Sequence, residues 1–379
     1  MKTKKVSIML IHYNQKQFIK NALDSVFKQT YKNIELIIAD DATPDFDLKD
    51  IKKYVEKINK QKYPVKYQVN KENICTVKNI NKALDKVTGD YLLIFAADDQ
   101  LHDENVITNM VEFYNKQDKD VSIVFGQCLM MDYDLKELKE EYINVTQAEE
   151  FNKLSAKEQY NFLSSNCFAA MGACMLNTKI LKDEGKFDER FKFIEDWVYF
   201  LKTTLNNHRM QYLDYICLLH RDGGISHNQQ LSEARIGFIT DLLKESELYI
   251  LPYFDRFNNE EKNKVVDFYV INRDYLNNNN CYYDDKEYKS LQKKYPKFFI
   301  IRKLKQFNKE YKIKVRKGLK RIEALSIIII LLILLNEHFD NKYEIIFNYG
   351  IIFFLVIILI MLLKILFLSI IKIFSKIKK

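Results

Sequence analysis

Three pairs of adjacent acidic residues stand beside apolar segments and are the clearest candidates for chemistry. They are Asp40-Asp41, Asp98-Asp99 and Glu195-Asp196. Two neighbouring carboxylates repel each other unless a positive charge lies close to them. A divalent cation, held by one carboxylate and by the oxygens of a diphosphate, would supply that charge. Each pair alone could be a helix N-cap, but all three together indicate a site for a phosphate-bearing ligand.

The segments around these pairs must bring them together. Up to about Leu219, short apolar runs alternate with longer amphipathic ones. Strands are predicted at 6–11, 34–39, 65–69, 91–96 and 121–125, with helices between them at 18–27, 48–58, 77–87 and 106–114. This α/β alternation predicts a mostly parallel central sheet flanked by helices. Ligands bind such sheets beyond the carboxyl ends of the strands, where the first two acidic pairs lie.

The remainder of the chain is less regular. Residues 134–165 are polar and helical in pattern, and we expect an insertion over the sheet edge. Further strands are predicted at 171–176 and 212–219, with a helix at 196–207 between them. A helical region follows at 232–295.

The C-terminal part is far more apolar than the rest. Residues 324–335 are apolar except for Ser326, and residues 345–363 are nearly all apolar. The second segment is long enough for a hydrocarbon core of roughly 30 Å, whereas the first is not on its own. We therefore predict a C-terminal transmembrane helical hairpin. The alternative is a buried hydrophobic hairpin in a soluble protein.

The net charge of +8 is concentrated directly before this hairpin, where residues 301–321 hold ten basic residues against Glu310. Such a run can bind nucleic acid, but its position favours anionic lipid headgroups. Lysines also follow the hairpin, and the positive-inside rule then places both flanks in the cytoplasm. We expect a membrane partner, no nucleic acid, and an N-terminal domain on the cytoplasmic side of the inner membrane. We predict three parts: an N-terminal α/β domain at 1–226, a helical region with the basic segment at 227–320, and a membrane anchor of two apolar helices at 321–379.

Cysteine spacing and the N-terminus agree with a cytoplasmic domain. The six cysteines show neither a CxxC motif nor zinc-ligand spacing, which is typical of reduced thiols. The apolar run at 6–11 is too short for a signal peptide. We therefore expect the main domain to stay on the side of the membrane where it was made.

Several motifs resemble family 2 glycosyltransferases with the GT-A fold. The opening block is Val6-Ser7-Ile8-Met9-Leu10-Ile11-His12-Tyr13-Asn14, and Ile37-Ile38-Ala39-Asp40-Asp41 follows it. Gly89-Asp90-Tyr91 and Asp98-Asp99 continue the likeness at the family's usual spacing, and Glu195-Asp196 resembles its ED motif. The resemblance extends from about Lys5 to Ser226.

The resemblance implies a role for each matching residue. Asp99 would ligate Mn²⁺ or Mg²⁺, and Asp196 would be the general base that deprotonates an acceptor hydroxyl. The helix N-terminus beside Asp196 should keep that carboxylate ionised. The implied donor-binding residues are Ile11, Tyr13, Asp40, Lys78, Asn79, Asp98, His220 and Arg221. Asp40 would accept a base N–H, and Asp98 would approach the ribose or the sugar.

Alternatives stay open for three of these residues. Asp196 could be only a helix N-cap, and His220 and Arg221 could be structural. The chain also departs from the family pattern. Ala96 stands where most relatives have a further Asp, and His12 stands where Thr or Ser is commoner.

The activity implied is inverting transfer of a sugar from a UDP- or dTDP-linked donor to a glycan or lipid-linked acceptor, in envelope polysaccharide or glycolipid synthesis. A dinucleotide-binding oxidoreductase would need a glycine-rich turn after the first strand, and none is present. A nucleotidyltransferase would need a glycine-rich basic signature there, which is also absent. A membrane scaffold that kept the fold but lost activity is the alternative.

Overall fold

The computed structural model describes residues 3–224, 231–281, 283–284 and 286–303, isolated positions between 305 and 325, and residues 352–363 and 365. The chain divides into two compact units, residues 1–288 and 289–379. The acidic pairs all lie in the first unit, which contains the sheet.

The first half of the sheet is the parallel arrangement that the sequence predicts. Its strand order is β3-β2-β1-β4, and every neighbouring pair in it is parallel. The bounds are β1 Val6–His12, β2 Ile34–Asp40, β3 Val65–Val69 and β4 Tyr91–Ala96. Strands β2 and β3 follow β1 on one side of it, and β4 is then added on the other side. The order in which the chain adds strands to the sheet therefore reverses at β1. Such a switch point leaves a crevice at the carboxyl ends of the strands.

The second half of the sheet is mixed, so the prediction of a mostly parallel sheet is only partly right. Strand β8 is antiparallel to β4 and to β6, whereas β6 and β9 are parallel. Periodicity could not predict this because an apolar strand has the same residue pattern in either direction. The bounds are β5 Gln100–Leu101, β6 Val121–Met131, β7 Leu138–Glu141, β8 Cys174–Asn177 and β9 Arg209–Arg221.

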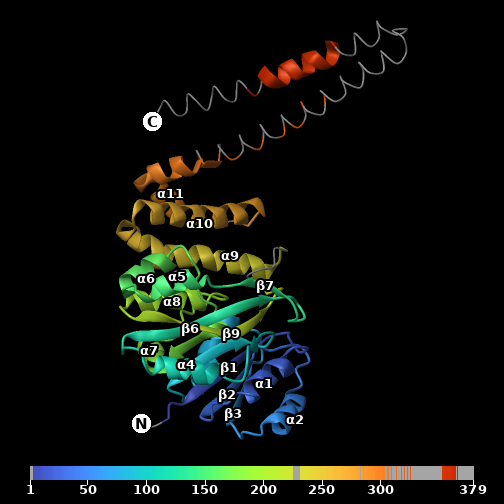
Figure 1. The fold of residues 1–379 in the computed structure, drawn as a ribbon, viewed down its shortest axis with the longest axis vertical. Helices are drawn as coiled ribbons and strands as arrows, with labels where there is room; N and C mark the ends of the chain where they lie inside the picture. Colours follow the sequence, from blue (N-terminus) through green and yellow to red (C-terminus); the bar gives the residue numbers. More distant parts are fainter. Residues whose placement is uncertain are drawn as a thin grey trace, which may run out of the picture. The chain divides into compact units, whose positions relative to one another are not determined.

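Helices cover both faces of this sheet (Figure 1). Helices α1 Ile19–Phe27, α2 Leu48–Ile58 and α4 Val106–Tyr114 contribute apolar side chains to one core cluster with β1. The predicted insertion at 134–165 contains β7 and two short helices, the second of which packs on α8. The other helices are α3 Thr76–Leu84, α5 Val145–Asn152, α6 Ala156–Leu163, α7 Thr178–Asp183 and α8 Asp196–Leu205.

A helical layer follows the sheet, as predicted from residue 232 onward. Helices α9 Glu233–Glu245 and α10 Asn259–Asn278 lie side by side, next to α6 and α8 in Figure 1. The turns η2 Ser246–Ile250 and η3 Leu251–Arg256 join them, and α11 Lys286–Lys294 comes after them. Helix α10 begins at a capping box, in which Asn258 and Glu261 bond each other's backbone amides. This layer packs against α8, through η2 and through the contact of Phe268 with Trp197.

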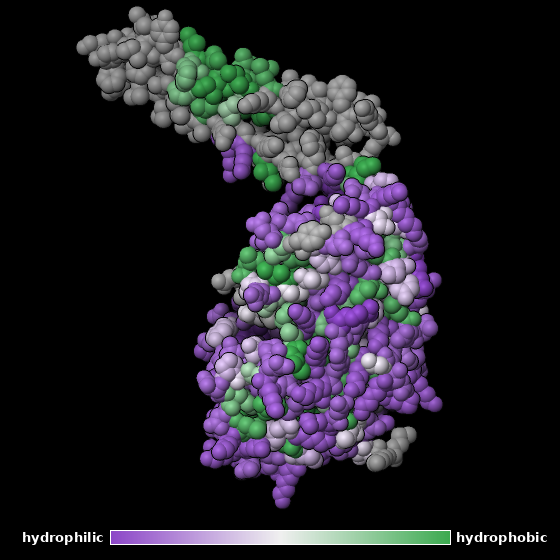
Figure 2. Space-filling model, turned by 180° about the vertical axis from the view of Figure 1, so that it is seen from behind, coloured by the Kyte–Doolittle hydropathy of each residue, from purple (hydrophilic) through white to green (hydrophobic). Residues whose placement is uncertain are grey.

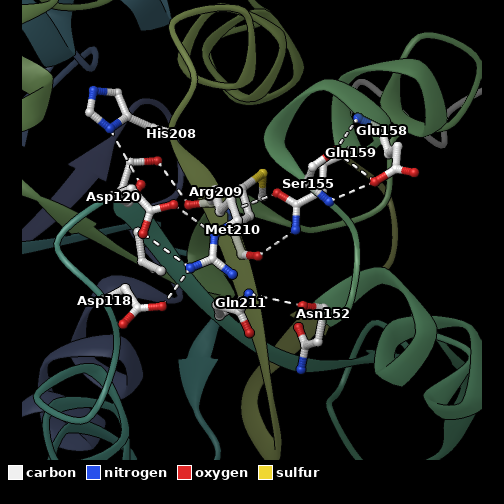
Figure 3. Close-up of polar contacts among 12 residues, drawn as sticks. Asp118, Asp120, Asn152, Ser155, Glu158, Gln159, His208, Arg209, Met210 and Gln211 are labelled. Carbon is white, nitrogen blue, oxygen red and sulfur yellow. Dashed lines mark hydrogen bonds and ion pairs between the residues drawn. The ribbon is translucent and has the colours of Figure 1, made fainter.

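The start of β9 is fixed by polar side chains from three other segments (Figure 3). Arg209 Nε donates to Asp120 at 2.7 Å and its Nη2 to Asp118 at 2.8 Å. Gln159 of α6 exchanges two hydrogen bonds of 2.8 Å with the backbone of Met210. These contacts fix the register of β9, whose far end carries His220 and Arg221.

The predicted transmembrane hairpin lies mostly outside the described residues. In the part of the chain that the structure describes, no helix is long and apolar enough to cross a bilayer. Residues 352–363 are helical and expose large apolar side chains, such as Phe353 at 62%. In Figure 2 this segment is green, whereas the surface of the first unit is mainly purple. The hairpin therefore stays a prediction.

A buried carboxylate stabilises the amino-terminal edge of the sheet. The side chain of Glu35 is fully buried and accepts hydrogen bonds from Lys5, Lys66, Ser7 and Thr88. Burial opposes its ionisation, but these hydrogen bonds outweigh burial and lower the pKa of Glu35 to about 2. The carboxylate thus stays charged inside the protein because every lone pair has a partner.

The pKa of Glu35 predicts a pH-dependent contribution to stability. Because the folded-state pKa lies below the ordinary value of 4.5, the contribution is present above that value and is lost as pH falls towards 2. Glu35→Gln should lower the free energy of unfolding at neutral pH by about 3 kcal/mol. It should also flatten the acid side of the stability profile. Urea unfolding across pH tests this, with the exposed Glu112→Gln as control; equal profiles for the two variants would contradict it.

Candidate active site

Two adjoining cavities lie at the carboxyl ends of β1 and β4. The larger has a volume of about 550 Å³ and the smaller about 330 Å³. Ile11 and Ala96, which pair in register on these strands, line both cavities. The cavities therefore occupy the crevice expected at the switch point of the sheet.

The larger cavity receives part of the predicted donor-binding set. Ile11, Tyr13 and Asn79 line it, and the Tyr13 side chain is 47% exposed. The amide of Asn79 is held by the backbone oxygen of Ala39 at 3.2 Å and by Asn70 at 3.0 Å. Lys78 points elsewhere: it is exposed and does not line this cavity. The structure thus brings three of the predicted residues together and leaves Lys78 apart.

The acidic pair at the end of β2 divides between two environments. Asp40 is fully buried, and its carboxylate accepts hydrogen bonds from His12 Nδ1 at 2.7 Å and from the Thr43 amide at 3.1 Å. Burial opposes ionisation of Asp40, but the bonds from His12 and Thr43 prevail and lower its pKa. Asp40 does not line the larger cavity, whereas Asp41 does. The role of Asp40 in donor binding therefore stays a prediction.

Asp41 lines the larger cavity but is not among the donor-binding residues predicted from the sequence. Its Oδ1 accepts from Asn70 and from the amide of Ile74, each at 2.9 Å. Asp40 is in register with His12, so both side chains lie on one face of the sheet. The next residue then points to the other side. Alternation along the strand was the signal that could have distinguished the two.

The acidic pair after β4 contacts the end of β9. Asp99 Oδ2 lies 2.9 Å from His220 Nδ1, and Asp99 Oδ1 accepts from the Arg221 amide at 3.0 Å. Burial opposes protonation of His220, but the charge of Asp99 prevails and raises the pKa of the imidazole. Asp99 and His220 both line the smaller cavity. The structure thus joins two predicted residues that are far apart in sequence.

Asp98 has a buried oxygen without a partner. Among the described residues, none donates a hydrogen bond to its Oδ1. Burial and the neighbouring charge of Asp99 raise the pKa of Asp98. Carboxylate oxygens are the ligands that Mg²⁺ and Mn²⁺ prefer, so an unpaired oxygen beside Asp99 fits a divalent cation. Within the described ranges, no group of three acidic, His or Cys side chains is arranged for a metal. Further ligands would have to come from a bound molecule.

The side chain of Arg221 contacts other parts of the protein and does not line either cavity. Its side chain is almost fully buried, and its guanidinium lies over the Phe18 ring, 3.9 Å from the centroid. Its Nε donates to the backbone oxygen of Asp98 at 2.9 Å, and Nη1 bonds the Tyr133 carbonyl. Arg221 lines neither cavity. It fixes the loop of the acidic pair to β9, so its predicted donor contact is not supported.

The third acidic pair begins α8 and lines the smaller cavity. The alternative of a simple N-cap is not observed, because the N-cap residue is Glu195 and its side chain makes no capping bond. Asp196 Oδ1 accepts only from the adjacent Trp197 amide, at 2.7 Å. Burial raises the pKa of both carboxyls, and the charge of Asp196 further raises that of Glu195. Burial therefore acts on the pKa of Asp196 in the direction opposite to the expected effect of the helix N-terminus.

Comparisons with known proteins agree with this geometry. Residues 7–185 match the model of glycosyl transferase family 2. This part of the chain is similar to family 2 glycosyltransferases. The chain is 24% identical over 209 residues to the amylovoran biosynthesis glycosyltransferase AmsB of Erwinia amylovora, covering 52% of this chain and 63% of that protein.

Two further proteins are similar to this glycosyltransferase domain. One is the GalNAc(5)-diNAcBac-PP-undecaprenol beta-1,3-glucosyltransferase of Campylobacter jejuni, 29% identical over 128 residues, covering 33% of this chain and 38% of that protein. The other is the solved mannosyltransferase PcManGT from Pyrobaculum calidifontis in complex with GDP-Man and Mn²⁺. It is 16% identical with a TM-score of 0.50, covering 72% of this chain and 75% of that one. The mixed α/β GT-A-like fold is thereby confirmed. The chain spans less than two thirds of the length of the two curated relatives.

The position of Arg221 predicts a stability effect. Lysine keeps the charge but loses the planar group that stacks on Phe18 and forms directed hydrogen bonds. Arg221→Lys should lower the free energy of unfolding by about 1–2 kcal/mol. The matched control is Arg209→Lys at the other end of β9, where the ion pairs are partly exposed and a loss below about 1 kcal/mol is expected. Equal stability of wild type and Arg221→Lys in urea unfolding would contradict the structural role.

Proposed function

We propose that this protein is an inverting glycosyltransferase that moves a sugar from a nucleoside-diphosphate donor to a hydroxyl of a glycan or lipid-linked acceptor. The observation that carries the proposal is that Asp99 and Asp196, from distant parts of the chain, line one cavity. That cavity adjoins the larger one through Ile11 and Ala96. A donor seated in the larger cavity would extend its sugar towards both carboxylates.

The larger cavity has the size and chemistry for the nucleotide. Its volume of about 550 Å³ lies within the range of small-molecule pockets. The half-exposed ring of Tyr13 offers a surface for the base, and Asp41 offers a carboxylate oxygen for a base N–H. A UDP- or dTDP-linked donor remains our prediction. The solved relative with GDP-Man supports a nucleoside-diphosphate sugar in general.

A divalent cation is part of the proposal. Asp99 and the unpaired oxygen of Asp98 would hold Mn²⁺ or Mg²⁺, and Mn²⁺ is present in the solved mannosyltransferase. When bound, such an ion neutralises the charge of a leaving diphosphate. His220 would keep the carboxylate of Asp99 oriented, because it contacts one of the two oxygens.

Asp196 is the proposed general base. A base whose pKa is raised towards neutrality is more effective once it has lost its proton, and burial has this effect on Asp196. Because the base would lie on the side of the sugar opposite the leaving group, displacement would be direct. The anomeric configuration would invert.

The setting of the reaction is inferred from the C-terminal sequence and the relatives. The basic run at 301–321 and the apolar segments after it support an inner-membrane anchor with the catalytic domain facing the cytoplasm. The AmsB relative is named for amylovoran biosynthesis, and the Campylobacter relative for an undecaprenol-linked glycan. Both names support a role in envelope polysaccharide or glycolipid synthesis. A catalytically inactive scaffold is the second candidate, and release of free nucleoside diphosphate from a nucleotide-sugar distinguishes the two.

Metal dependence is the first test. Chelation should abolish nucleoside diphosphate release from nucleotide-sugars, and Mn²⁺ or Mg²⁺ should restore it. Asp99→Asn should stay inactive at every metal concentration because the substitution removes a charged ligand. Asp134→Asn, at an exposed position, should behave as wild type. Full activity of Asp99→Asn in chelator would remove the metal from the mechanism.

The general base predicts a pH dependence. Because burial raises the pKa of Asp196 and the base must be deprotonated, kcat/KM should rise with pH through a pKa that lies above the ordinary range of an aspartate. Asp196→Asn should lower kcat by about 10²- to 10⁴-fold while donor Kd stays the same. Glu195→Gln should leave the pH of this rise in place, because burial rather than the charge of Glu195 raises the pKa of Asp196. Near-normal turnover of Asp196→Asn would contradict the assignment of Asp196 as the general base.

A further inference from the structure

One short segment of the chain, residues 190–196, lines both cavities, and we call it the bridging segment. Residues 192–193 line the larger cavity, and residues 194–196, which include the proposed base Asp196, line the smaller one. Residues 191–195 belong to no helix or strand. Their backbone groups therefore need hydrogen-bond partners from other elements, and these partners decide where the bridging segment lies.

Helix α9 supplies the partners on one side. The carboxylate of Asp241 is buried, and its Oδ2 accepts from the amides of Lys192 at 2.7 Å and of Phe193 at 2.8 Å. Lys244, three residues later on the same face of the helix, donates from Nζ to the Arg190 carbonyl at 2.8 Å. Hydrogen bonds to charged groups are stronger than those between neutral groups. Two charged side chains of α9 thus hold the backbone of the bridging segment at three residues.

A glycine allows α9 to approach the bridging segment this closely. Gly237 lies four residues before Asp241, on the same face of the helix, and lines the larger cavity. A Cβ atom at this position would lie 2.5 Å from Cε2 of the Phe193 ring, which is too close for a contact. Glycine is also less favourable than alanine inside a helix, so its presence here fits a packing requirement. The Phe193 ring occupies the space that a larger residue at 237 would need.

The other side of the bridging segment contacts α3. The Lys192 carbonyl accepts from the amide of Val77, in the first turn of α3, at 3.2 Å. Cys75 and Thr76, directly before Val77, also line the larger cavity. The bridging segment therefore joins α9 and α3 into one wall of this cavity. A shift of the segment would change the shape of the larger cavity and, further along the segment, the position of Asp196.

We propose that Asp241 is a positioning residue that acts on both cavities through the bridging segment: it holds the wall of the donor site and it places the proposed base. The proposal rests on the proposed glycosyltransferase function. Asp241 lines neither cavity, so it acts only through the residues that it holds. Its loss should weaken donor binding and slow turnover together, whereas loss of Asp196 should slow turnover with donor Kd unchanged. Asp241 and the bridging segment both lie beyond the family match, which ends at residue 185.

Variants of Asp241 test this role in the full-length protein. UDP, dTDP and GDP, each with Mn²⁺, are first titrated onto the wild type, and the nucleotide that binds is used throughout, with its sugar conjugate for the kinetics. Asp241→Asn keeps an oxygen that can accept from an amide but loses the charge, and Asp241→Ala loses both contacts. Donor Kd and KM should rise and kcat should fall. The value of kcat/KM should drop about tenfold for Asp241→Asn and further for Asp241→Ala. Glu260→Gln, which removes an exposed charge on α10, should behave as wild type.

Gly237→Ala is the steric test, and it guards against a folding defect. Alanine favours the helix, so α9 should form at least as readily, but the new methyl group displaces the Phe193 ring. Donor KM should rise about tenfold without a parallel loss of melting temperature. Ile236→Ala, on the same helix at a position that lines neither cavity, is the control and should keep the donor KM of wild type.

The outcomes separate this proposal from the proposed function. If the variants of Asp241 and Gly237 keep the donor KM and kcat of wild type, whatever their melting temperatures, the role of α9 is merely structural and the proposal is wrong. If the wild type neither binds a nucleoside diphosphate nor releases one from its sugar conjugate, the glycosyltransferase function itself is refuted.

Discussion

The contact between Asp99 and the end of β9 is the interaction on which the site depends. It joins the loop after β4 to a strand that begins more than a hundred residues later, through His220 and the Arg221 amide. A carboxylate with these two partners can stay in one orientation inside the protein. The neighbouring Asp98 is left with an unpaired oxygen as a result. The contact therefore ties the loop after β4 to the end of β9.

The rigidity of this contact comes from residues around it. The guanidinium of Arg221 is stacked on Phe18 and donates a hydrogen bond to the Asp98 carbonyl. The sequence predicted that this charge would contact the donor, whereas in the structure it contacts other parts of the protein. The other end of β9 is fixed by Arg209 and Gln159. Strand β9 is thereby held at both ends, and its position sets the distance between the acidic pair and α8.

Burial gives the carboxyls different chemistry. Asp40 is buried but receives hydrogen bonds from His12 and Thr43, and its pKa is lowered. Glu195 and Asp196 are half-buried beside each other, Asp196 accepts a hydrogen bond from the Trp197 amide, and the pKa values of both carboxyls are raised. The difference follows from the number of hydrogen-bond donors each carboxyl receives. A carboxyl with few donors in an apolar cavity is suited to exchange protons, and a fully bonded one is suited to hold structure.

The sequence by itself determined the elements of the first half of the sheet and the sites of the acidic pairs. The bounds of β1, β2, β3 and β4 lie within one residue of those predicted, because long apolar runs broken by polar turns define buried strands. Only the tertiary structure decided which member of the first two pairs faces a cavity, that β8 runs antiparallel, and that α9 and α10 line the smaller cavity. Asp40 and Asp41 are neighbours of the same type, and one step along a strand reverses the direction of a side chain. Phe238 and Phe268 look like ordinary core residues in sequence, since only the tertiary structure brings them to the cavity that Asp196 lines.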